Sequence, residues 1–194
     1  MTAIPTASAP ATSAPSASPP PRGSDVRLPR ALGVDPGLTR TGWALVEGLG
    51  RRYHLIDAGI VAPRGGQSDE DLAPRLADGY AQFRTVLDAT VPDLVVIEDI
   101  FASPRFPRAA LKMAHLRGVL CLAAAQAGLR VMPLTATTVK QRLTGNGHAS
   151  KEQVQRMVFE LCDVTGVKVP NDLSDAVGLA IAGLHQLRYA RPMR

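Results

Sequence analysis

Cysteine is scarce in this chain of 194 residues, which contains only Cys121 and Cys162. Their spacing matches no zinc-ligand pattern, and no cluster of histidine and cysteine accompanies them. Both lie in apolar stretches of helical character, so we expect buried free thiols, as is typical of a protein in the reducing cytoplasm. The sequence therefore argues against a disulfide-stabilised secreted domain and against a zinc site.

Long hydrophobic runs and an excess of acidic residues are also lacking. No run reaches 18 apolar residues, so no membrane-spanning helix is expected. The chain has 22 Lys and Arg against 17 Asp and Glu, a formal net charge of +5. This basic balance is compatible with a polyanionic partner such as nucleic acid, although charge alone does not identify one.

The composition divides the chain into two parts. Residues 1–28 consist largely of Ala, Pro, Ser and Thr, which bury too little apolar surface to offset the entropy of ordering, so we predict a disordered tail. This segment has no basic stretch followed by an apolar core, and thus does not resemble a secretory signal. A flexible tail and a start site assigned too far upstream both remain possible explanations. Residues 29–190 are predicted to form one domain.

Hydrophobic periodicity predicts five strands and five helices in that domain. The expected strands are residues 31–34, 41–47, 53–61, 94–97 and 131–134. The expected helices are residues 71–89, 107–128, 135–143, 151–161 and 173–189. The first three strands follow one another closely enough to form an antiparallel meander. Together these elements predict an α/β fold with a five-stranded mixed sheet and helices on both faces.

The predicted helix over residues 107–128 is unusual because its second half is apolar almost all round. Residues 119–125 read VLCLAAA. A helix with one buried face would show more polar residues there, so we expect both sides to be covered. A second subunit is one way to cover the outer side.

Two acidic residues stand at the ends of predicted strands. Asp35 follows the apolar run 31–34, and Glu98 follows the run 94–97. Burying a carboxylate costs free energy unless a cation or hydrogen bonds compensate for it. If the two strands are parallel neighbours, both carboxylates lie at one edge of the sheet, where open sheets usually bind ligands.

Two further acids, Asp172 and Asp175, precede the apolar part of the last predicted helix. Their spacing of three residues would place both on one helix face. Converging carboxylates repel one another unless divalent cations lie between them, and an all-oxygen set favours Mg²⁺ or Mn²⁺ over zinc. Two such ions about 4 Å apart can activate a water and stabilise the leaving oxygen of a phosphodiester.

Three of these acids also have a purely structural interpretation. Asp35 precedes a Pro-Gly turn, Glu98 could be a solvated loop residue, and Asp172 could be a helix N-cap. Their joint occurrence at two strand ends and a helix start favours the metal site.

Four segments of the chain carry the acids and the polar residues near them. They are DPGLTRTGWALVE (35–47), VVIEDIFAS (95–103), VKQRLTGNGHASKEQVQRMV (139–158) and PNDLSDAVGLAIAGLH (170–185). In this order and spacing they resemble the RuvC-type crossover (Holliday) junction endodeoxyribonucleases of bacteria. The resemblance implies a ribonuclease H-like fold and a homodimer. It further implies Mg²⁺-dependent, paired symmetric nicking of four-way DNA junctions in recombination and repair, together with a branch-migration complex of the RuvA and RuvB type.

The resemblance also implies roles for individual residues. The catalytic, metal-binding acids correspond to Asp35, Glu98, Asp172 and Asp175. Lys151 corresponds to a basic residue close to the scissile phosphate.

Further residues are expected to contact DNA. Phe101 corresponds to an aromatic residue near the junction centre, and Lys140 to a basic residue close to the DNA. Arg105 and Arg108 interleave with aromatic residues, a pattern suited to stacking on unpaired bases. For Lys151, a role as a solvated surface lysine is the alternative.

The chain departs from the family pattern near the predicted junction loop. Asp99 stands where the family commonly has Gln, residues 103–107 read SPRFP, and His115 lies in a neighbourhood where Gln is usual. The nucleotide preference at the cut is therefore left open. Two other functions are weighed against the resolvase: a ribonuclease H-like nuclease that processes ribosomal RNA precursors, and an actin-like ATPase or sugar kinase, which needs a second, duplicated domain.

Overall fold

The computed structural model describes residues 27–37, 39–50, 52–64, 72–100, 107–163 and 173–189. Most of the predicted N-terminal tail, residues 1–26, lies outside these ranges. The elements in chain order are β1 (Arg30–Asp35), β2 (Thr41–Leu49), β3 (Arg52–Val61), α1 (Leu72–Thr90), β4 (Leu94–Glu98), α2 (Pro107–Gln126), β5 (Arg130–Leu134), α3 (Ala136–Thr144), α4 (Lys151–Leu161), β6 (Cys162–Asp163) and α5 (Ser174–Tyr189). The described part contains no helix that is long and apolar enough to cross a membrane.

The strands form one mixed sheet in the order β5-β4-β1-β2-β3-β6. β1, β2 and β3 make the predicted antiparallel meander, whereas β4 and β5 run parallel to β1. The five predicted strands are confirmed, but the predicted count of five is corrected by a sixth, β6, which pairs with the edge strand β3. β6 is two residues long and directly follows α4, so no alternating pattern could reveal it.

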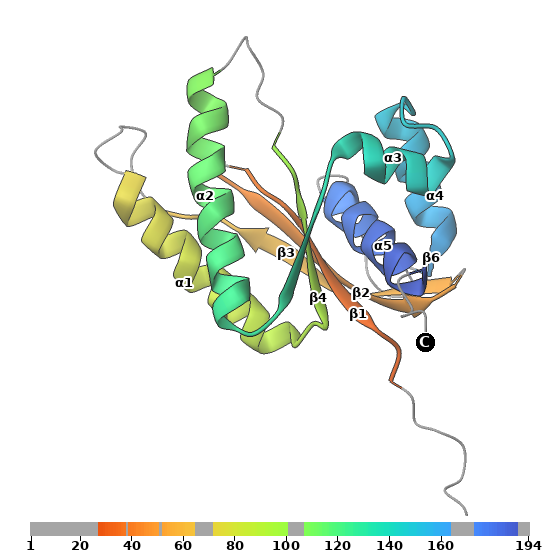
Figure 1. Ribbon diagram of the computed structural model, residues 1–194, viewed down its shortest axis with the longest axis horizontal. Helices are drawn as coiled ribbons and strands as arrows, with labels where there is room; N and C mark the ends of the chain where they lie inside the picture. Colours follow the sequence, from red (N-terminus) through yellow and green to blue (C-terminus); the bar gives the residue numbers. More distant parts are fainter. Residues whose placement is uncertain are drawn as a thin grey trace, which may run out of the picture.

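Helices cover both faces of the sheet, as predicted (Figure 1). α1 and α2 lie on one face, and α5 lies on the other, with α3 and α4 beside it. Each face has its own hydrophobic core: Val96, Val177 and Ile181 belong to the core under α5, whereas Phe83 and Leu120 belong to the core under α1 and α2. The alternation of side chains along β1 and β4 feeds both cores, which explains why these strands are apolar throughout.

Two glycines let α5 approach the sheet closely. A Cβ atom added to Gly33 of β1 would lie 1.9 Å from the main-chain oxygen of Ala176, and one added to Gly183 would lie 2.3 Å from Cγ2 of Val96. Neither contact leaves room for a side chain, so glycine is required at both crossings. The first turn of α5 is thereby fixed above β1.

α4 begins at a well-defined residue. The Ser150 side chain accepts a hydrogen bond from the main-chain N–H of Gln153, and the Gln153 side chain accepts one from the N–H of Ser150. This is a capping box, and it satisfies two amide groups that a helix start otherwise leaves unpaired. Lys151 is therefore held at the first position of α4.

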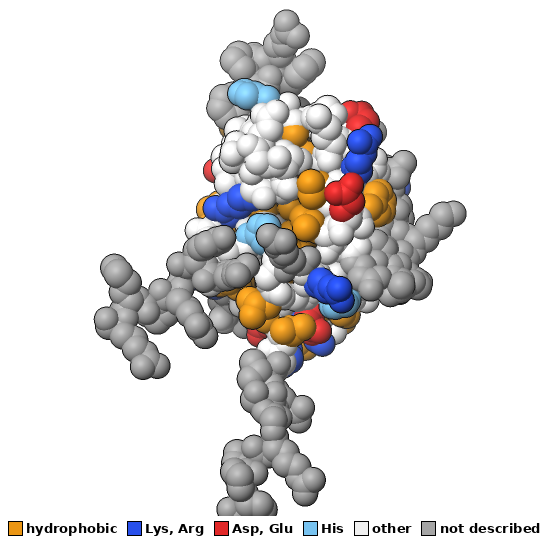
Figure 2. All heavy atoms as spheres, turned by 90° about the vertical axis from the view of Figure 1, so that its right-hand side faces the viewer, with side chains coloured by type: hydrophobic (Ala, Val, Ile, Leu, Met, Phe, Trp, Pro, Cys, Tyr) orange, Lys and Arg blue, Asp and Glu red, His pale blue; other side chains and the backbone are white. Residues whose placement is uncertain are grey.

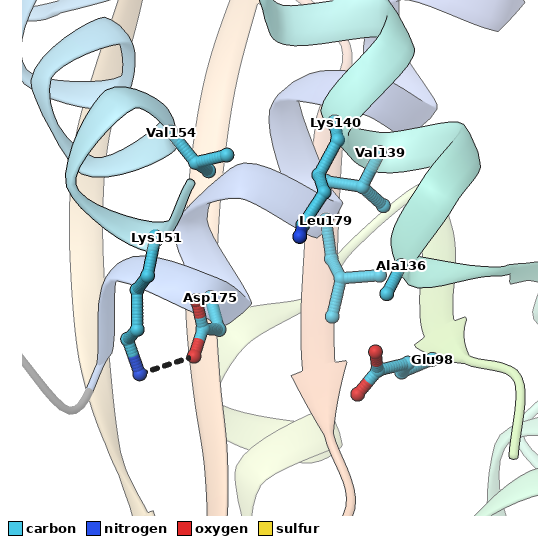
Figure 3. Close-up of a pocket in the computed structure, with 8 residues that line it drawn as sticks. All are labelled: Glu98, Ala136, Val139, Lys140, Lys151, Val154, Asp175 and Leu179. Atoms are coloured by element: carbon cyan, nitrogen blue, oxygen red, sulfur yellow. Dashed lines mark hydrogen bonds and ion pairs between the residues drawn. The ribbon is translucent and has the colours of Figure 1, made fainter. Parts of the chain in front are cut away.

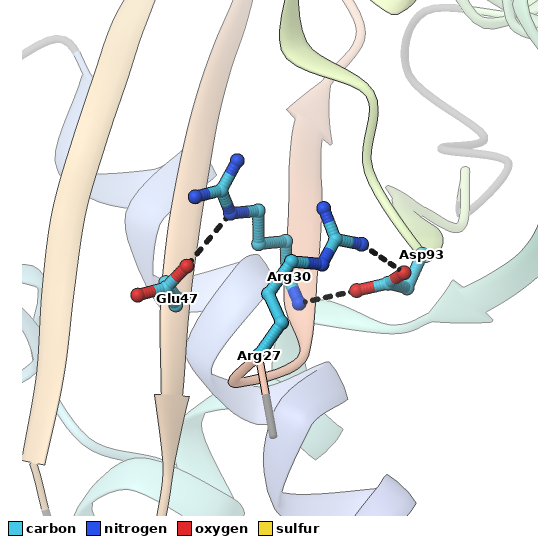
Figure 4. A network of polar contacts seen from close by, with 4 residues as sticks. All are labelled: Arg27, Arg30, Glu47 and Asp93. Atoms are coloured by element: carbon cyan, nitrogen blue, oxygen red, sulfur yellow. Dashed lines mark hydrogen bonds and ion pairs between the residues drawn. The ribbon is translucent and has the colours of Figure 1, made fainter. Parts of the chain in front are cut away.

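An ion-pair network holds the start of β1 between its neighbours (Figure 4). The Arg30 side chain donates to Glu47 of β2 at 2.7 Å, and the Arg30 main-chain N–H donates to Asp93 at 2.8 Å. Arg27 pairs with the same Asp93. Because Asp93 immediately precedes β4, the network helps to fix the register of β1 against both β2 and β4.

α2 is buried on one side only. Leu116, Leu120 and Ala123 are fully buried against the sheet and α1, whereas the side chains of Leu111 and Leu122 are 61% and 51% exposed. The expectation that both sides are covered is therefore not met by the described residues of a single chain.

Candidate active site

Asp35 and Glu98 lie side by side at one edge of the sheet. β1 and β4 are parallel neighbours, and their register pairs Val34 with Ile97, the residues immediately before the two acids. The predicted juxtaposition is thus confirmed. The carboxyl groups of Asp35 and Glu98 are hydrogen-bonded to each other.

Burial and mutual repulsion make these two carboxyl groups hard to ionise together. Burial is the main cause that raises the pKa of Glu98 to about 8, and the hydrogen bond to Asp35 and the charges of Asp35 and Asp175 add to it. Burial also raises the pKa of Asp35, against the opposing effects of the hydrogen bond with Glu98 and the charge of Lys151. The pair therefore holds a proton to higher pH than isolated carboxyl groups do.

The main chain around Asp35 is held by a tight turn. The Thr41 hydroxyl donates to the main-chain oxygen of Gly37 at 3.2 Å and accepts from the Gly37 N–H at 3.4 Å. A Cβ atom on Gly37 would lie 2.2 Å from the main-chain oxygen of Arg40, so only glycine fits this turn. Thr41 is fully buried next to the site.

Asp175 and Lys151 form an ion pair beside the two strand-end acids. Asp175 is in the first turn of α5, and its Oδ2 lies 3.0 Å from Nζ of Lys151 at the start of α4. The close approach of α5 at Gly33 places this turn over β1. Asp175 is near enough to raise the pKa of both Asp35 and Glu98 through its charge.

These groups border a cavity of about 240 Å³ between β4, α3, α4 and α5 (Figure 3). Polar atoms come from Glu98, Lys140, Lys151 and Asp175, and the wall is completed by Ala136, Val139, Val154 and Leu179. Figure 3 shows the ammonium group of Lys140 and the carboxyl group of Glu98 pointing into the same space. The site thus combines acids at the sheet edge with two lysines approaching from the helices.

The family model described as Crossover junction endodeoxyribonuclease RuvC matches residues 31–183. The chain belongs to the RuvC family. The match runs from the second residue of β1 through β6 into α5, and it includes every residue that lines the cavity. The activity of the protein is that of a crossover junction endodeoxyribonuclease. The alternatives, a nuclease that processes ribosomal RNA and an actin-like ATPase, are therefore set aside.

Individual relatives agree with this membership. The RuvC proteins of Rhodopirellula baltica and Pelotomaculum thermopropionicum are 38% and 36% identical over 152 and 163 residues, which cover 78% and 84% of this chain and 84% and 97% of theirs. The structure of Thermus thermophilus RuvC in complex with a Holliday junction substrate has a TM-score of 0.72 at 30% identity, covering 82% of this chain and 95% of that one. The yeast mitochondrial Holliday junction resolvase shares the fold at 13% identity, with a TM-score of 0.60 and coverage of 85% and 82%.

Four of the predicted site residues have no described side chain: Asp172 and Phe101, predicted from the RuvC resemblance, and Arg105 and Arg108, predicted from their interleaving with aromatic residues. Asp172, Phe101 and Arg105 lie outside the described residues. Arg108 belongs to the first turn of α2, but its side chain is not described. Their predicted roles in metal and DNA binding therefore remain predictions.

RuvC proteins are metal-dependent nucleases, and the donor set of this chain suits a hard divalent cation. Among the described residues, no group of three or more His, Cys, Asp or Glu side chains lies close enough to hold a metal ion. However, Asp35 and Glu98 present carboxyl oxygens to one another, and their raised pKa values arise from burial and repulsion that a cation would relieve. Oxygen donors of this kind are the ligands that Mg²⁺ and Mn²⁺ prefer.

One residue that contacts the end of β4 at the site was not predicted from the sequence. Arg117 of α2 donates from Nε to the main-chain oxygen of Glu98 at 2.9 Å, and its Nη2 lies 3.0 Å from Oδ1 of Asp99. The local sequence does not single out Arg117, because the same helix also carries Arg108, Lys112 and His115. Asp99 departs from the family pattern, but nothing in the sequence links it to a residue 18 positions away.

Proposed function

We propose that the protein resolves four-way DNA junctions by paired, symmetric nicks, with Asp35, Glu98, Asp172 and Asp175 holding two Mg²⁺ or Mn²⁺ ions. The observation that carries the proposal is the hydrogen-bonded pair of buried carboxyl groups at the ends of β1 and β4. Burial and repulsion between these acids raise the pKa of both carboxyl groups, and a cation bound between them would offset that cost. The junction-bound structure of Thermus thermophilus RuvC supports the choice of substrate.

The residues around the cavity have different proposed roles in the reaction. When bound, the two divalent ions supply an activated water and stabilise the leaving 3′ oxygen. Asp35 and Glu98 would hold the ions as carboxylates, and the proton between them would be released to solvent when the cations bind. Lys151, already paired with Asp175 at 3.0 Å, keeps a positive charge beside the acids and orients the Asp175 carboxylate. Lys140 places a second ammonium group where a phosphate enters.

The helix start at Lys151 favours a DNA phosphate. The positive dipole end of a helix N-terminus attracts anions, and Lys151 adds a mobile charge there. On the face that carries α3 and α4, Lys and Arg side chains lie singly among neutral and acidic ones (Figure 2). Separate phosphate contacts of this kind suit recognition of junction shape rather than of base sequence. Phe101, Arg105 and Arg108 are proposed as further DNA contacts.

A homodimer supplies the second nick. The exposed leucines of α2, Leu111 and Leu122, are 11 residues apart, which is close to three helical turns, so they lie on one stripe. A two-fold dimer through this stripe presents two identical sites to a junction that has two-fold character. Association with a branch-migration complex of the RuvA and RuvB type is proposed from the family resemblance, and a cytoplasmic location from the two free cysteines.

The test is cleavage of a synthetic four-way junction with Mg²⁺ or Mn²⁺ by the parent protein and by Asp35→Asn. We expect symmetric nicks from the parent, and junction binding without cleavage from Asp35→Asn, because the amide keeps the shape but loses the ligand charge. Asp88→Asn, which changes an exposed acid on α1, is the matched control and is expected to cut normally. Equal cleavage of linear duplex and junction by the parent would overturn the proposal.

A further inference from the structure

The end of β4 is held from the α2 side by a single guanidinium group. Nε of Arg117 donates to the main-chain oxygen of Glu98 at 2.9 Å, and Nη2 forms an ion pair with Asp99 at 3.0 Å. The Arg117 side chain is 22% exposed, so most of it lies within the protein. One residue of α2 therefore contacts both residues at the point where the catalytic acid leaves the sheet.

The same short segment is also held from the β5 side. The main-chain N–H of Asp99 donates to the main-chain oxygen of Leu134 at 2.8 Å, which continues the β4–β5 pairing one residue past the end of β4. Strand ends fray when such partners are absent. With Leu134 on one side and Arg117 on the other, the main chain at Glu98 and Asp99 has little freedom to rotate.

Arginine is chemically suited to this position, and lysine is not. The planar guanidinium group offers several N–H donors in a fixed arrangement, so it can bind a main-chain oxygen and a carboxylate together. A lysine ammonium on a flexible stem can satisfy one of them well. The carboxylate of Asp99 turns its contact into a charge-assisted hydrogen bond, which is stronger than a neutral one.

We propose that Arg117 is a positioning residue, which holds the end of β4 so that the Glu98 carboxyl group is presented for metal binding, with Asp99 orienting the guanidinium group. This inference rests on the proposed role of Glu98 as a metal ligand. Groups that orient a metal ligand typically change metal affinity or activity by 10–100-fold when they are removed.

The test measures Mn²⁺ binding to the metal-free protein by calorimetry in the absence of DNA, and then junction binding and cleavage. For Arg117→Ala we expect Mn²⁺ affinity to fall about 10–100-fold, a higher Mn²⁺ concentration for half-maximal cleavage, and unchanged junction affinity. Arg117→Lys is expected to lie between the parent and Arg117→Ala. Asp99→Gln keeps an acceptor for the guanidinium group and is expected to stay within about threefold of the parent.

Arg84→Ala is the matched control. Arg84 of α1 also donates to α2, with Nη1 3.5 Å from the main-chain oxygen of Ala123, but among the described residues its hydrogen bonds and ion pairs do not involve β4. Its loss is expected to leave Mn²⁺ affinity unchanged. A merely structural arginine would lower the melting temperature in both variants while leaving Mn²⁺ affinity the same.

Several results would overturn the inference. Parent-like Mn²⁺ binding by Arg117→Ala would do so, as would weakened junction binding with intact Mn²⁺ affinity, which would make Arg117 a DNA contact. If Arg117→Ala does not fold, Arg117→Lys and Asp99→Ala decide by the same titration. If the parent itself binds no Mn²⁺, the proposed function fails instead. In that case, hydrogen exchange still tests whether Arg117 holds the end of β4. The amides of residues 94–100 are then expected to exchange faster in Arg117→Ala than in the parent.

Discussion

At the residue scale, Glu98 links the stability of the protein to pH. Its pKa is about 8 in the folded protein, against 4.5 for an ordinary glutamate. Between these values the folded state binds a proton that the unfolded state has lost. The corresponding stability is fully present below pH 4.5 and is lost as the pH rises through about 8.

Glu98→Gln is therefore expected to stabilise the metal-free protein at high pH. Glutamine cannot ionise, so it avoids the repulsion that develops around Glu98. In chelator at pH 9 we expect the melting temperature to rise by several degrees over that of the parent, since about 1 kcal/mol corresponds to roughly 2–4 °C in a domain of this size. The difference should shrink towards pH 5, as thermal unfolding across that range would record.

Glu160→Gln provides the comparison for this prediction. Glu160 is exposed on α4, so its replacement should leave the pH profile of the melting temperature unchanged. A Glu98→Gln profile that runs parallel to the parent at all pH values would contradict the assignment. With excess Mg²⁺ the order should reverse at high pH, because the parent then gains more stability from the cation than Glu98→Gln does.

Only some residues of the site could be predicted from the sequence. Asp35 and Glu98 could be predicted because a charged residue at the end of an apolar strand is unusual. This feature is visible in the local sequence without knowledge of any contact partner. Arg117 was not found, because its importance arises from contacts to a strand 19 residues away that only the folded chain brings together. The ion pair between Lys151 and Asp175 likewise joins two helices, and no local pattern encodes it.

At the scale of elements, the placement of α5 depends on the absence of a side chain at Gly33. Gly33→Ala would force a methyl group to within 1.9 Å of a main-chain oxygen in α5, and a backbone atom cannot move aside as a flexible side chain can. We expect a loss of at least about 1–3 kcal/mol in the free energy of unfolding. Because the first turn of α5 carries Asp175, metal-dependent cleavage should fall as well.

Gly118→Ala separates this packing effect from the general effect of adding a methyl group. Gly118 is within α2, and an added Cβ there meets nothing within 4 Å. Alanine in a helix is favoured over glycine by about 0.5–1 kcal/mol, so this variant should be slightly more stable than the parent. Denaturant unfolding of both variants gives the comparison, and a Gly33→Ala protein as stable as Gly118→Ala would contradict the close approach of α5.

The elements themselves were largely predictable because their signals are local. Strand and helix ranges follow the apolar periodicity, and the predicted helix over residues 151–161 coincides with α4. β6 was not predictable, because two residues form a strand there only by pairing with the edge of β3. The parallel pairing of β1 with β4 was a conditional prediction, since it depends on where α1 returns the chain.

At the scale of the whole molecule, the one-sided burial of α2 calls for a partner. Leu111 and Leu122 are more than half exposed on one stripe of a helix whose opposite side is fully buried. The sequence predicted that this apolar helix is covered all round, and the single chain leaves that prediction unmet. A second copy of the chain would meet it and would also bring a second active site to the junction.

Leu122→Glu is expected to weaken this dimer at least about 100-fold, because an unpaired charge buried in an apolar interface costs about 3 kcal/mol or more. Light scattering at micromolar concentration should then record monomers.

On a plasmid that extrudes a cruciform, paired nicks linearise the circle, whereas independent nicks leave it open and circular. The parent should yield linear product, and Leu122→Glu should yield nicked circles at reduced rate. Ile56→Glu is the control. It changes an exposed aliphatic residue of β3, away from α2, and should behave like the parent. If Leu122→Glu stays dimeric and still linearises the plasmid, the stripe on α2 is not the subunit interface.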